Sequence, residues 1–405
     1  MPVKVFSTTY SMAALYASGM YRIKISIKML ARKGWKCYVT PMKVLTRNTD
    51  FTASVDSPVP TEKPNLLGMT LDELETFFVS LGEKKFRGAQ VFQWLYKYGA
   101  ESFDDMTDIS KTLRERLGEV AVIHHAAAIK TQQSGEKEAY ATKKILFELA
   151  DGQKIESVFI PDDERRTVCI STQVGCAVGC EFCATGWMGF NRNLTVGEIV
   201  GQLIYVRKYI DPGISNVVFM GMGEPFLNYE NVIAAAQIIA NEKGVGMAAK
   251  HITISTSGII PKIYEYADEG HPYNLAISLN ATTDEVRRRV MPITKKYPLT
   301  ELLQAAKHFN STRRNPVTLE YVLMADVNDT NADALRLRKF ASELGRCKVN
   351  VIPYNPIEGP ALKRPSQESI DHFMKLVSSI QSPLTLRRSR GTDISAACGQ
   401  LAVKN

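Results

Sequence analysis

Three closely spaced cysteines are the feature of this chain that most directly predicts chemistry. Cys176, Cys180 and Cys183 follow one another with the spacing C-x3-C-x2-C. A closed structural metal site uses four protein ligands, whereas a site that binds a substrate at the metal leaves one position open. Three thiolates in one loop therefore predict a cubane [4Fe-4S] cluster with one iron free to bind a small molecule. A zinc site with Cys169 as the fourth ligand is the alternative that these residues leave open.

The segments that must position this loop alternate between strand and helix from residue 167 onward. Such alternation predicts parallel strands joined by crossover helices. The expected strands are 167–171, 217–220, 251–255, 275–279, 318–323 and 348–352. The expected helices lie near 195–209, 229–243, 259–268, 284–290, 299–311 and 330–344. Because six units are too few for a closed eight-fold barrel, we predict an α/β fold with an open, partial (βα)6 TIM-like barrel over residues 167–386.

Polar and glycine-rich segments follow the expected strands at their carboxyl ends, where ligands bind in folds of this class. The cysteine loop follows the first strand, and four other segments follow the second, third, fourth and sixth strands. These segments are Gly221–Pro225, Ser255–Gly258, Ser278–Asn280 and Pro353–Pro356. A single glycine-rich turn after a strand is common. Five such segments at one rim predict a ligand-binding site around the cysteine loop.

Two smaller structures are expected before the barrel. Apolar residues recur at helical spacing in 70–79, 88–98 and 109–117, which predicts a small helical domain over residues 65–120. The turn Ala150–Gly152 separates two β-rich runs and predicts a β-hairpin over residues 140–166 that leads into the barrel.

The charge of the chain is concentrated near its start. The formal net charge is +8, but residues 1–49 contain nine Lys and Arg and no Asp or Glu, which leaves 41 cations and 42 anions in the remainder. Such a leader predicts an organelle transit peptide over residues 1–50, for plastid or mitochondrion, followed by a linker over 51–64. A disordered basic tail is the alternative. Seven cysteines, three of them clustered, indicate a reducing compartment. No apolar run reaches the roughly 18 residues of a membrane span.

Several motifs together identify a family resemblance. They are CAVGCEFCATGWMGFNRNLT, GMGEP, ISTSGIIP, AISLNATTDEVRRRVMPI and LRRSRGTDISAACGQL. From about Leu67 to Leu401 the chain resembles the RlmN family of radical S-adenosylmethionine (SAM) methyltransferases. These enzymes methylate C2 of an adenosine in large-subunit ribosomal RNA, and some members also methylate tRNA. Many radical SAM enzymes share the cysteine spacing, whereas few also carry AACGQ near the C-terminus.

The resemblance implies which residues bind the cofactors. Cys176, Cys180 and Cys183 would hold the [4Fe-4S] cluster, and its open iron would bind SAM, of which two molecules are used per turnover. Glu224 would bind the methionine amino group of SAM. The other implied SAM contacts are Gly223, Ser255, Ser278, Leu279, Asn280 and Asn355. The better-known bacterial members carry His at the position of Asn280; a SAM contact through the backbone would survive this difference, whereas a contact through the ring would not.

The resemblance also implies the catalytic residues. Adenine C2 is a poor nucleophile, so the methyl group would first be transferred to Cys398, in the C-terminal segment 387–405. After addition of this carbon to the base, Glu156 would remove the proton from C2. Cys169 would then attack Cys398, forming a disulfide and releasing the methylated product. By itself, Cys169 has the character of a buried core residue and Glu156 that of an ordinary strand carboxylate.

RNA is the partner that the resemblance implies, with the helical domain as an accessory RNA-binding unit. Unpaired RNA is expected, because the target base must leave its stack. Local basic groups that could contact RNA are 287–289, 295–296, 313–314, Arg387, Arg388, Arg390, Lys84, Lys85 and Arg87. We also expect a reduced electron donor such as ferredoxin or flavodoxin, a monomer, and no membrane association. Two alternatives are a Cfr-type enzyme, which methylates C8 of the same adenosine, and a zinc-bound RNA-binding protein without catalysis.

Overall fold

The computed structural model describes the backbone of residues 5–16 and 19–30, and the backbone and side chains of 63–135, 140–163, 165–379 and 382–403. The chain divides into two units, Met1–Thr61 and Glu62–Asn405. In the first unit, strand β1 (Val5–Tyr16) pairs antiparallel with β2 (Gly19–Leu30). The rest of the predicted transit peptide and the linker up to residue 62 lie outside the described residues.

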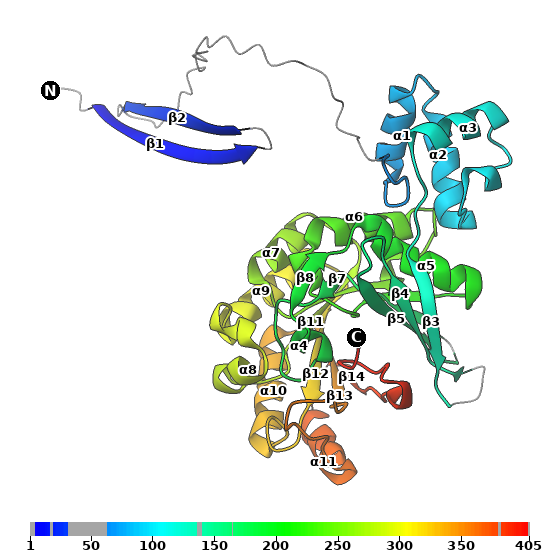
Figure 1. Ribbon diagram of the computed structural model, residues 1–405. Coiled ribbons are helices and arrows are strands. Elements are labelled where there is room, and N and C mark those ends of the chain that lie inside the picture. The colour runs from blue at the N-terminus through cyan, green and yellow to red at the C-terminus, as the bar shows by residue number, and fades with distance from the viewer. Residues whose placement is uncertain are drawn as a thin grey trace. The chain divides into compact units, whose positions relative to one another are not determined.

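A small helical region opens the second unit (Figure 1). Its elements are α1 (Leu71–Ser80), α2 (Phe86–Gln93), the π-helical η1 (Trp94–Tyr98), the short η2 (Phe103–Asp105) and α3 (Lys111–Val120). Thr70 caps α1 in a reciprocal pair with Glu73, which satisfies backbone donors at the start of the helix. Leu74, Phe78 and Phe92 are fully buried between these helices. The apolar residues at helical spacing therefore lie on helices in this region.

The main sheet has ten strands, in the order β14-β13-β12-β11-β10-β9-β6-β5-β4-β3. All neighbours from β6 to β14 pair in parallel, whereas β3, β4, β5 and β6 pair antiparallel. The strands are β3 (Ala127–Gln133), β4 (Lys143–Glu148), β5 (Lys154–Pro161), β6 (Arg166–Cys169), β9 (Asn216–Phe219), β10 (Ile252–Thr256), β11 (Asn274–Ser278), β12 (Val317–Leu323), β13 (Cys347–Pro353) and β14 (Leu384–Leu386). The predicted hairpin is β4–β5.

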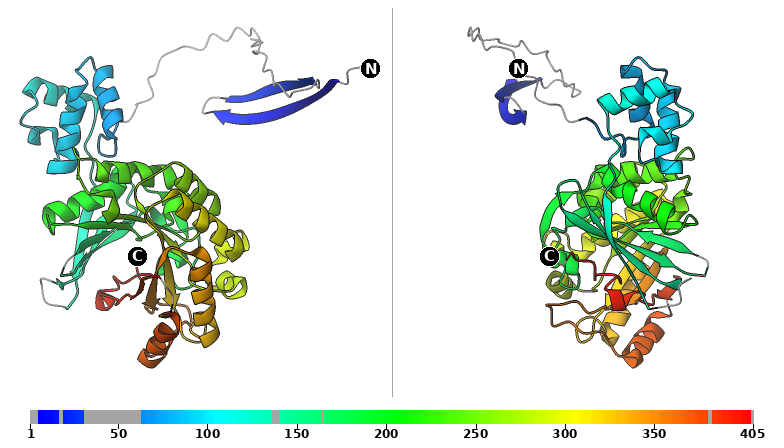
Figure 2. Two further views of the ribbon diagram at one scale, coloured as in Figure 1. Left: turned by 180° about the vertical axis from the view of Figure 1, so that it is seen from behind. Right: turned by 45° about the vertical axis from the view of Figure 1, so that its right-hand side comes forward.

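Helices cover the outer side of the parallel strands (Figure 2). They are α5 (Val196–Tyr209), α6 (Tyr229–Ala240), α7 (Ile260–Asp268), α8 (Asp284–Val290), α9 (Leu299–Thr312), α10 (Asn331–Leu344) and α11 (Gln367–Val377). The predicted fold class, a partial TIM-like barrel, is confirmed, and β14 extends it by one further parallel strand. In the described part of the chain, no helix is both long enough and apolar enough to span a bilayer.

A row of fully buried apolar residues on one face of the sheet forms part of the barrel core. Phe219, Ile254, Ile277, Leu319 and Val349, one from each of five neighbouring strands, have no exposed surface. The register of the strands places all five residues on the same face of the sheet. This rigid interior fixes the positions of the loops that follow the strands, and those loops carry the predicted site.

Candidate active site

A small hairpin holds the ends of the cysteine loop together. Strand β7 (Gln173–Gly175) pairs antiparallel with β8 (Phe190–Asn193), and α4 (Ala184–Trp187) begins directly after Cys183. The backbone N–H of Cys176 donates to the carbonyl of Gly189 (2.8 Å). Gly175 has φ of +74°, and a Cβ there would lie 1.9 Å from the carbonyl oxygen of Gly189. Only glycine fits at this position, so the closure of the loop depends on it.

The three cluster cysteines lie together in this loop, partly buried and unbonded to one another. Burial raises the pKa of Cys176 to about 12, and the nearby negative charge of Glu224 acts in the same direction. Burial also raises the pKa of Cys180 well above its ordinary value, and the neighbouring thiols of Cys183 and Cys176 raise it further. Such thiols become thiolates only when a positive centre binds them, because the cation offsets the cost of burying the charge. Their chemistry therefore fits a metal cluster.

The thiols of the described residues do not form a preformed site for a single metal ion. Within the ranges that the structure describes, no three His, Cys, Asp or Glu side chains are placed to hold one metal ion. A zinc ion needs its four ligands to converge on a single point. In a [4Fe-4S] cluster each thiolate binds a different iron, so the sulfurs stand further apart. Three thiols that do not converge on one ion are therefore compatible with a cluster.

Glu224 is a buried carboxylate placed to receive a cationic group. Its side chain accepts hydrogen bonds from the backbone N–H of Phe226 (3.0 Å) and of Ser257 (2.7 Å). Burial raises its pKa, and among the described residues no Lys or Arg forms an ion pair with it. A buried carboxylate without a counter-charge is costly. The amino group of a bound SAM would supply that charge, so the residues present fit the predicted cofactor.

A backbone turn brings Glu224 to this position. Gly223 has φ of +103°, and a Cβ there would lie 2.6 Å from the side chain of Gln173. The side-chain oxygen of Gln173 accepts from the backbone N–H of Glu224 (2.8 Å). Gly223 thus lets the turn after β9 approach β7 closely. Gln173 was not predicted as a site residue, and nothing in the sequence pattern marks it.

Arg287 is a fully buried cation and not a contact for RNA, which corrects its place among the predicted basic groups. It donates to the carbonyls of Ser257 (2.7 Å), Ser278 (3.1 Å) and Leu279 (3.0 Å), and to the hydroxyl of Thr294 (2.9 Å). Burial lowers its pKa to about 10, partly offset by Cys180. Arg287 therefore fixes the ends of β10 and β11 next to the cluster loop.

The other predicted SAM contacts lie at the ends of β10 and β11. Ser255 pairs with Ala276 across β10 and β11, and Leu279 is fully buried at the end of β11. Asn280 has φ of +54° and is buried. Its side-chain oxygen accepts from Val322 N (2.9 Å), and its carbonyl accepts from the side-chain amide of Asn328 (2.7 Å). The structure thus gives Asn280 a role in positioning the loop after β11.

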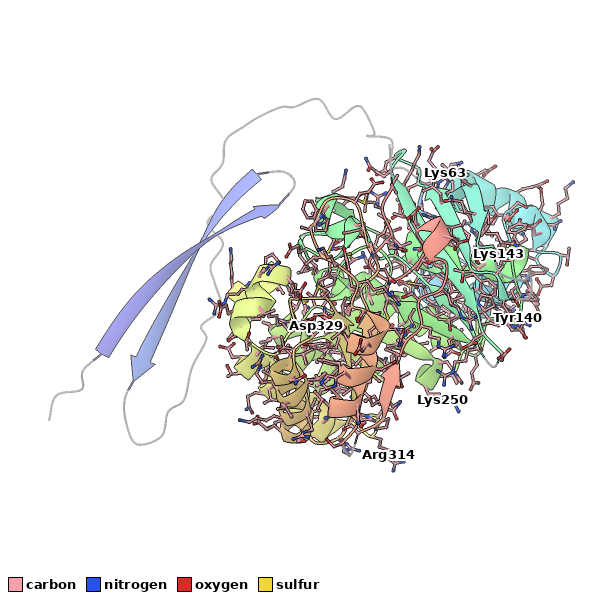
Figure 3. The ribbon with its side chains drawn as sticks, turned by 90° about the horizontal axis from the view of Figure 1, so that it is seen from below. Lys63, Tyr140, Lys143, Lys250, Arg314 and Asp329 are labelled. Carbon is pink, nitrogen blue, oxygen red and sulfur yellow. The ribbon has the colours of Figure 1, made fainter. Side chains whose placement is uncertain are left out.

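Among the remaining basic groups, exposure differs from residue to residue. Arg313 donates to the carbonyls of Tyr266 (3.2 Å) and Ala267 (3.3 Å) and is partly committed to the fold. Arg314 lies at the periphery of the molecule in Figure 3, and Arg289 has an exposed side chain. Consecutive basic residues therefore do not form one continuous surface.

The C-terminal residues 387–403, here called the strap, are bound by three separate parts of the barrel. The hairpin contributes Lys144, whose ammonium group donates to Ser395 O (3.3 Å). Helix α4 contributes the bonds Ala184 N–H to Gly399 O (2.7 Å) and Thr185 Oγ1 to Leu401 O (2.6 Å). The loop after β13 contributes Asn355, whose Nδ2 donates to Cys398 O (3.1 Å). Asn355, predicted as a SAM contact, thus holds the strap beside the cysteine loop.

The structure brings Cys398 and Cys169 into the same region, although 229 positions separate them. Cys169 ends β6 and is buried; burial raises its pKa to about 12, and the charge of Cys398 adds to this effect. Cys398 is accessible to solvent, yet the surrounding protein raises its pKa to about 11. Both thiols are free.

Glu156 is buried in β5 and touches the strap. Its Oε1 forms an ion pair with Lys144 Nζ (3.0 Å), and its Oε2 accepts from Ala402 N–H (3.1 Å). Burial raises its pKa, whereas Lys144 opposes this effect. The raised pKa favours proton uptake by Glu156. Lys144, which the sequence reasoning missed, links this carboxylate to the strap at Ser395.

Arg387 affects the reactivity of both redox-capable thiols. Burial raises the pKa of Cys169 and of Cys398, and the positive charge of Arg387 opposes this effect at both thiols. The guanidinium group of Arg387 lies 3.9 Å from the carboxylate of Glu320 in β12. Loss of this cation in Arg387→Met should raise both pKa values and decrease the thiolate fraction at any fixed pH. We expect iodoacetamide labelling of Cys398, followed by peptide mass spectrometry below pH 10, to slow about threefold, since each unit of pKa changes the thiolate fraction tenfold.

The control for this prediction is Arg388→Met, the exposed neighbouring arginine. It should leave the labelling rate unchanged. In the unaltered protein the rate should rise about tenfold per pH unit from pH 7 to 10, because only the thiolate reacts. Equal labelling rates for Arg387→Met and the unaltered protein would show that the cation does not act on Cys398.

A three-cysteine loop at the carboxyl-end rim of a partial (βα)6 barrel, beside a buried carboxylate, defines the radical SAM class of enzyme. The model of the Radical SAM superfamily matches residues 170–337, and the model of the ribosomal RNA large subunit methyltransferase N-terminal domain matches residues 64–123. A crystal structure of a radical SAM methyltransferase from Sphaerobacter thermophilus is 42% identical, with a TM-score of 0.80, covering 84% of this chain and all of that one.

The chain belongs to the RlmN family and is a radical SAM RNA methyltransferase. The dual-specificity RNA methyltransferase RlmN of Geotalea uraniireducens is 47% identical over 84% of this chain and 97% of its own length. The RlmN protein of Geobacter sulfurreducens is 46% identical over 84% of this chain and 92% of its own length. The RlmN protein of Pseudomonas entomophila is 43% identical over 84% of this chain and 91% of its own length.

Proposed function

We propose that the protein methylates C2 of an adenosine in large-subunit ribosomal RNA, with tRNA as a further candidate substrate. The observation that carries this proposal is the meeting of Cys398, Cys169 and Glu156 around the strap, at the rim that holds the cluster cysteines. A radical methyltransferase that modifies an aromatic carbon needs a carrier for the methyl carbon, a base and a second thiol. The described relatives are named dual-specificity RNA methyltransferases, which supports the choice of substrate.

The three residues would divide the chemistry between them. When bound, the cluster and SAM would supply the methyl group, a radical that removes a hydrogen atom from it, and an acceptor for the one electron left over after the carbon has added to the base. The Cys398 thiolate would accept the methyl group and present its carbon to the base. Glu156, whose pKa is raised by burial, would take the proton from C2. Cys169 would attack the sulfur of Cys398; an S–S bond forms, the S–C bond breaks, and the carbon leaves with the electron pair and takes up a proton.

The position of methylation can be tested directly. The protein with its cluster reconstituted anaerobically is incubated with SAM, a reductant and ribosomal RNA, and the digested nucleosides are compared with authentic 2-methyladenosine and 8-methyladenosine. The proposal expects 2-methyladenosine. A product that co-elutes with 8-methyladenosine would show a Cfr-type reaction, and no methylated adenosine would overturn the proposed function. Cys347→Ala, a buried cysteine outside the site, is the matched control and should stay active.

The remaining partners belong to the same proposal. Two molecules of SAM per turnover are expected, one as methyl donor to Cys398 and one as radical source. A ferredoxin or flavodoxin would reduce the cluster, and the protein would act as a monomer. Counting both S-adenosylhomocysteine, which the methyl donor leaves behind, and 5′-deoxyadenosine, which the radical source leaves behind, per methylated adenosine tests the stoichiometry; a total of one SAM consumed per product would contradict it.

We also propose import into a plastid or mitochondrion. The support is compositional: residues 1–49 carry nine cations and no anion, and the N-terminal family model begins only at residue 64. A fluorescent protein fused behind residues 1–50 should enter an organelle, whereas a fusion to residues 51–64 alone should stay in the cytosol. Cytosolic fluorescence for both fusions would contradict import.

A further inference from the structure

Three apolar side chains next to the cluster loop point into solvent. Trp187 is 59% exposed, Phe190 48% and Met188 38%, and they flank Gly189 between α4 and β8. We call these residues the Trp187 surface. Scattered exposed apolar residues are normal, but adjacent large ones in a catalytic region mark contact with a partner.

The Trp187 ring is held in place although most of it is exposed. Its indole N–H donates to the carbonyl of Glu181 (3.0 Å). The ring also lies over Gly359, where an added Cβ would be 3.8 Å from its nearest atom. An anchored, solvent-facing ring loses little conformational entropy when a flat group stacks on it. This arrangement suits stacking of a nucleobase on the ring, and the exposure of the ring does not fit a role in core packing.

Glu181, which accepts the hydrogen bond from the Trp187 ring, also lies close to the cation of Arg289. Glu181 donates its backbone N–H to Val290 O (2.9 Å), and its carboxylate lies 3.8 Å from Nε of Arg289, whose side chain is 60% exposed. Glu181 therefore connects an exposed aromatic ring and an exposed guanidinium group. Stacking on an aromatic face combined with a cation for phosphate is the usual way to bind single-stranded nucleic acid.

The Trp187 surface is also next to the proposed methyl carrier. Helix α4, which ends at Trp187, donates from Ala184 to Gly399 and from Thr185 to Leu401, on the strap that carries Cys398. An RNA strand whose adenosine reaches Cys398 must pass close to this helix. The protein after residue 49 has 41 cations and 42 anions, so RNA affinity must come from local sites and not from net charge.

We propose that Trp187 and Arg289 bind the RNA substrate, with the indole ring stacking on an unpaired base that flanks the target adenosine and Arg289 contacting its phosphate. This inference rests on the proposed role of Cys398 as methyl carrier, which fixes where the target base must go. A docking surface for the electron donor is the competing occupant, because apolar contacts near a cluster also suit a redox protein.

Binding is measured without turnover, so the result does not depend on which carbon is methylated. The full-length protein with its cluster is titrated into a fluorescein-labelled RNA hairpin with unpaired adenosines, without SAM or reductant, and fluorescence anisotropy is followed. Trp187→Leu should raise Kd about tenfold, because it removes one stacked base. Trp187→Phe keeps an aromatic face and should stay within about threefold of the unaltered protein. Arg289→Met should weaken binding and lower the salt slope by about one.

Two controls separate RNA binding from the alternatives. Leu335→Ala removes an exposed apolar side chain from α10, away from the cluster loop, and should leave Kd unchanged. Iron content and the visible spectrum of each variant show whether the cluster is intact. An unchanged Kd for Trp187→Leu overturns the proposal. If Trp187→Leu leaves Kd unchanged but slows cluster reduction by flavodoxin and not by dithionite, the surface serves the electron donor instead.

Discussion

The Cys169→Ala variant should accumulate a covalent crosslink between Cys398 and RNA, and its release of methylated product should fall on the order of a thousandfold or more. Without the second thiol, the bond between Cys398 sulfur and the transferred carbon has no nucleophile to break it. The crosslink is visible as an RNA-shifted band in a denaturing gel. Digestion with nuclease and protease should locate the attached adenosine on the peptide that contains Cys398.

The structure offers a matched control for this variant. Cys347 is also a buried cysteine at a strand terminus, but it contacts Ala341 and Ser382, away from the strap. Cys347→Ala should turn over normally and form no crosslink. Both substitutions remove one buried sulfur and should cost similar stability, so a difference between them reports chemistry. Free turnover by Cys169→Ala without a crosslink would refute the role of Cys169.

The Lys144→Met variant should lose about 3–5 kcal/mol of folding free energy, because it leaves the Glu156 carboxylate buried and unpaired. Both side chains of this pair are nearly inaccessible, at 8% and 7% exposure. The midpoint of urea unfolding measures the loss. Relative to the unaltered protein, the increase in the rate of hydrogen exchange should be largest in the strap, since Lys144 also binds Ser395 O. Replacing both residues, as Lys144→Met with Glu156→Met, should recover most of the stability.

The destabilisation of Lys144→Met should depend on pH. Burial already raises the pKa of Glu156, and loss of the lysine removes the cation that opposes this effect. A carboxyl group with a raised pKa in the folded state favours folding at low pH, and this contribution is lost as the pH rises through the raised value. The deficit should therefore be small below about pH 4.3, the ordinary pKa of glutamate, and grow above it.

The exposed pair Lys154–Glu148 on the same hairpin is the control. Its charged atoms lie 3.7 Å apart, with side chains 39% and 44% exposed. Surface ion pairs contribute little, so Lys154→Met should change stability by less than about 1 kcal/mol. If Lys144→Met behaves like Lys154→Met, then the buried pair does not hold the strap.

The barrel could be predicted from the sequence because its signal is local and strong. The run expected over 318–323 is the buried strand Val317–Leu323, and the helix expected over 284–290 is Asp284–Val290. Strand β3 was missed because none of its residues is buried and its sequence AAIKTQQ lacks apolar alternation. Strands β7 and β14 have three residues each, which is too short for any periodicity.

The site was only partly predictable, because its contacts join distant parts of the chain. Glu156 and Ala402 are hydrogen-bonded across 246 positions, and no local pattern encodes such a contact. The three consecutive arginines 287–289 show a second limit. Successive residues on a helix point in directions about 100° apart, so Arg287 faces the core while Arg289 faces solvent. A run of like charges therefore does not reveal which member is structural.

The attachment of the strap has a consequence for how the enzyme is assembled in the cell. Residues 387–403 follow the whole barrel in the chain, and their bonds reach back to Lys144, Ala184, Thr185 and Asn355. The strap can therefore dock only on a barrel that has already folded. Until then the cysteine loop is open to the proteins that deliver iron and sulfide. Alkylation of Cys398 during refolding should stay fast until the other probes of folding are complete. Maturation would thus proceed from cluster insertion to closure, and Cys398 would arrive last.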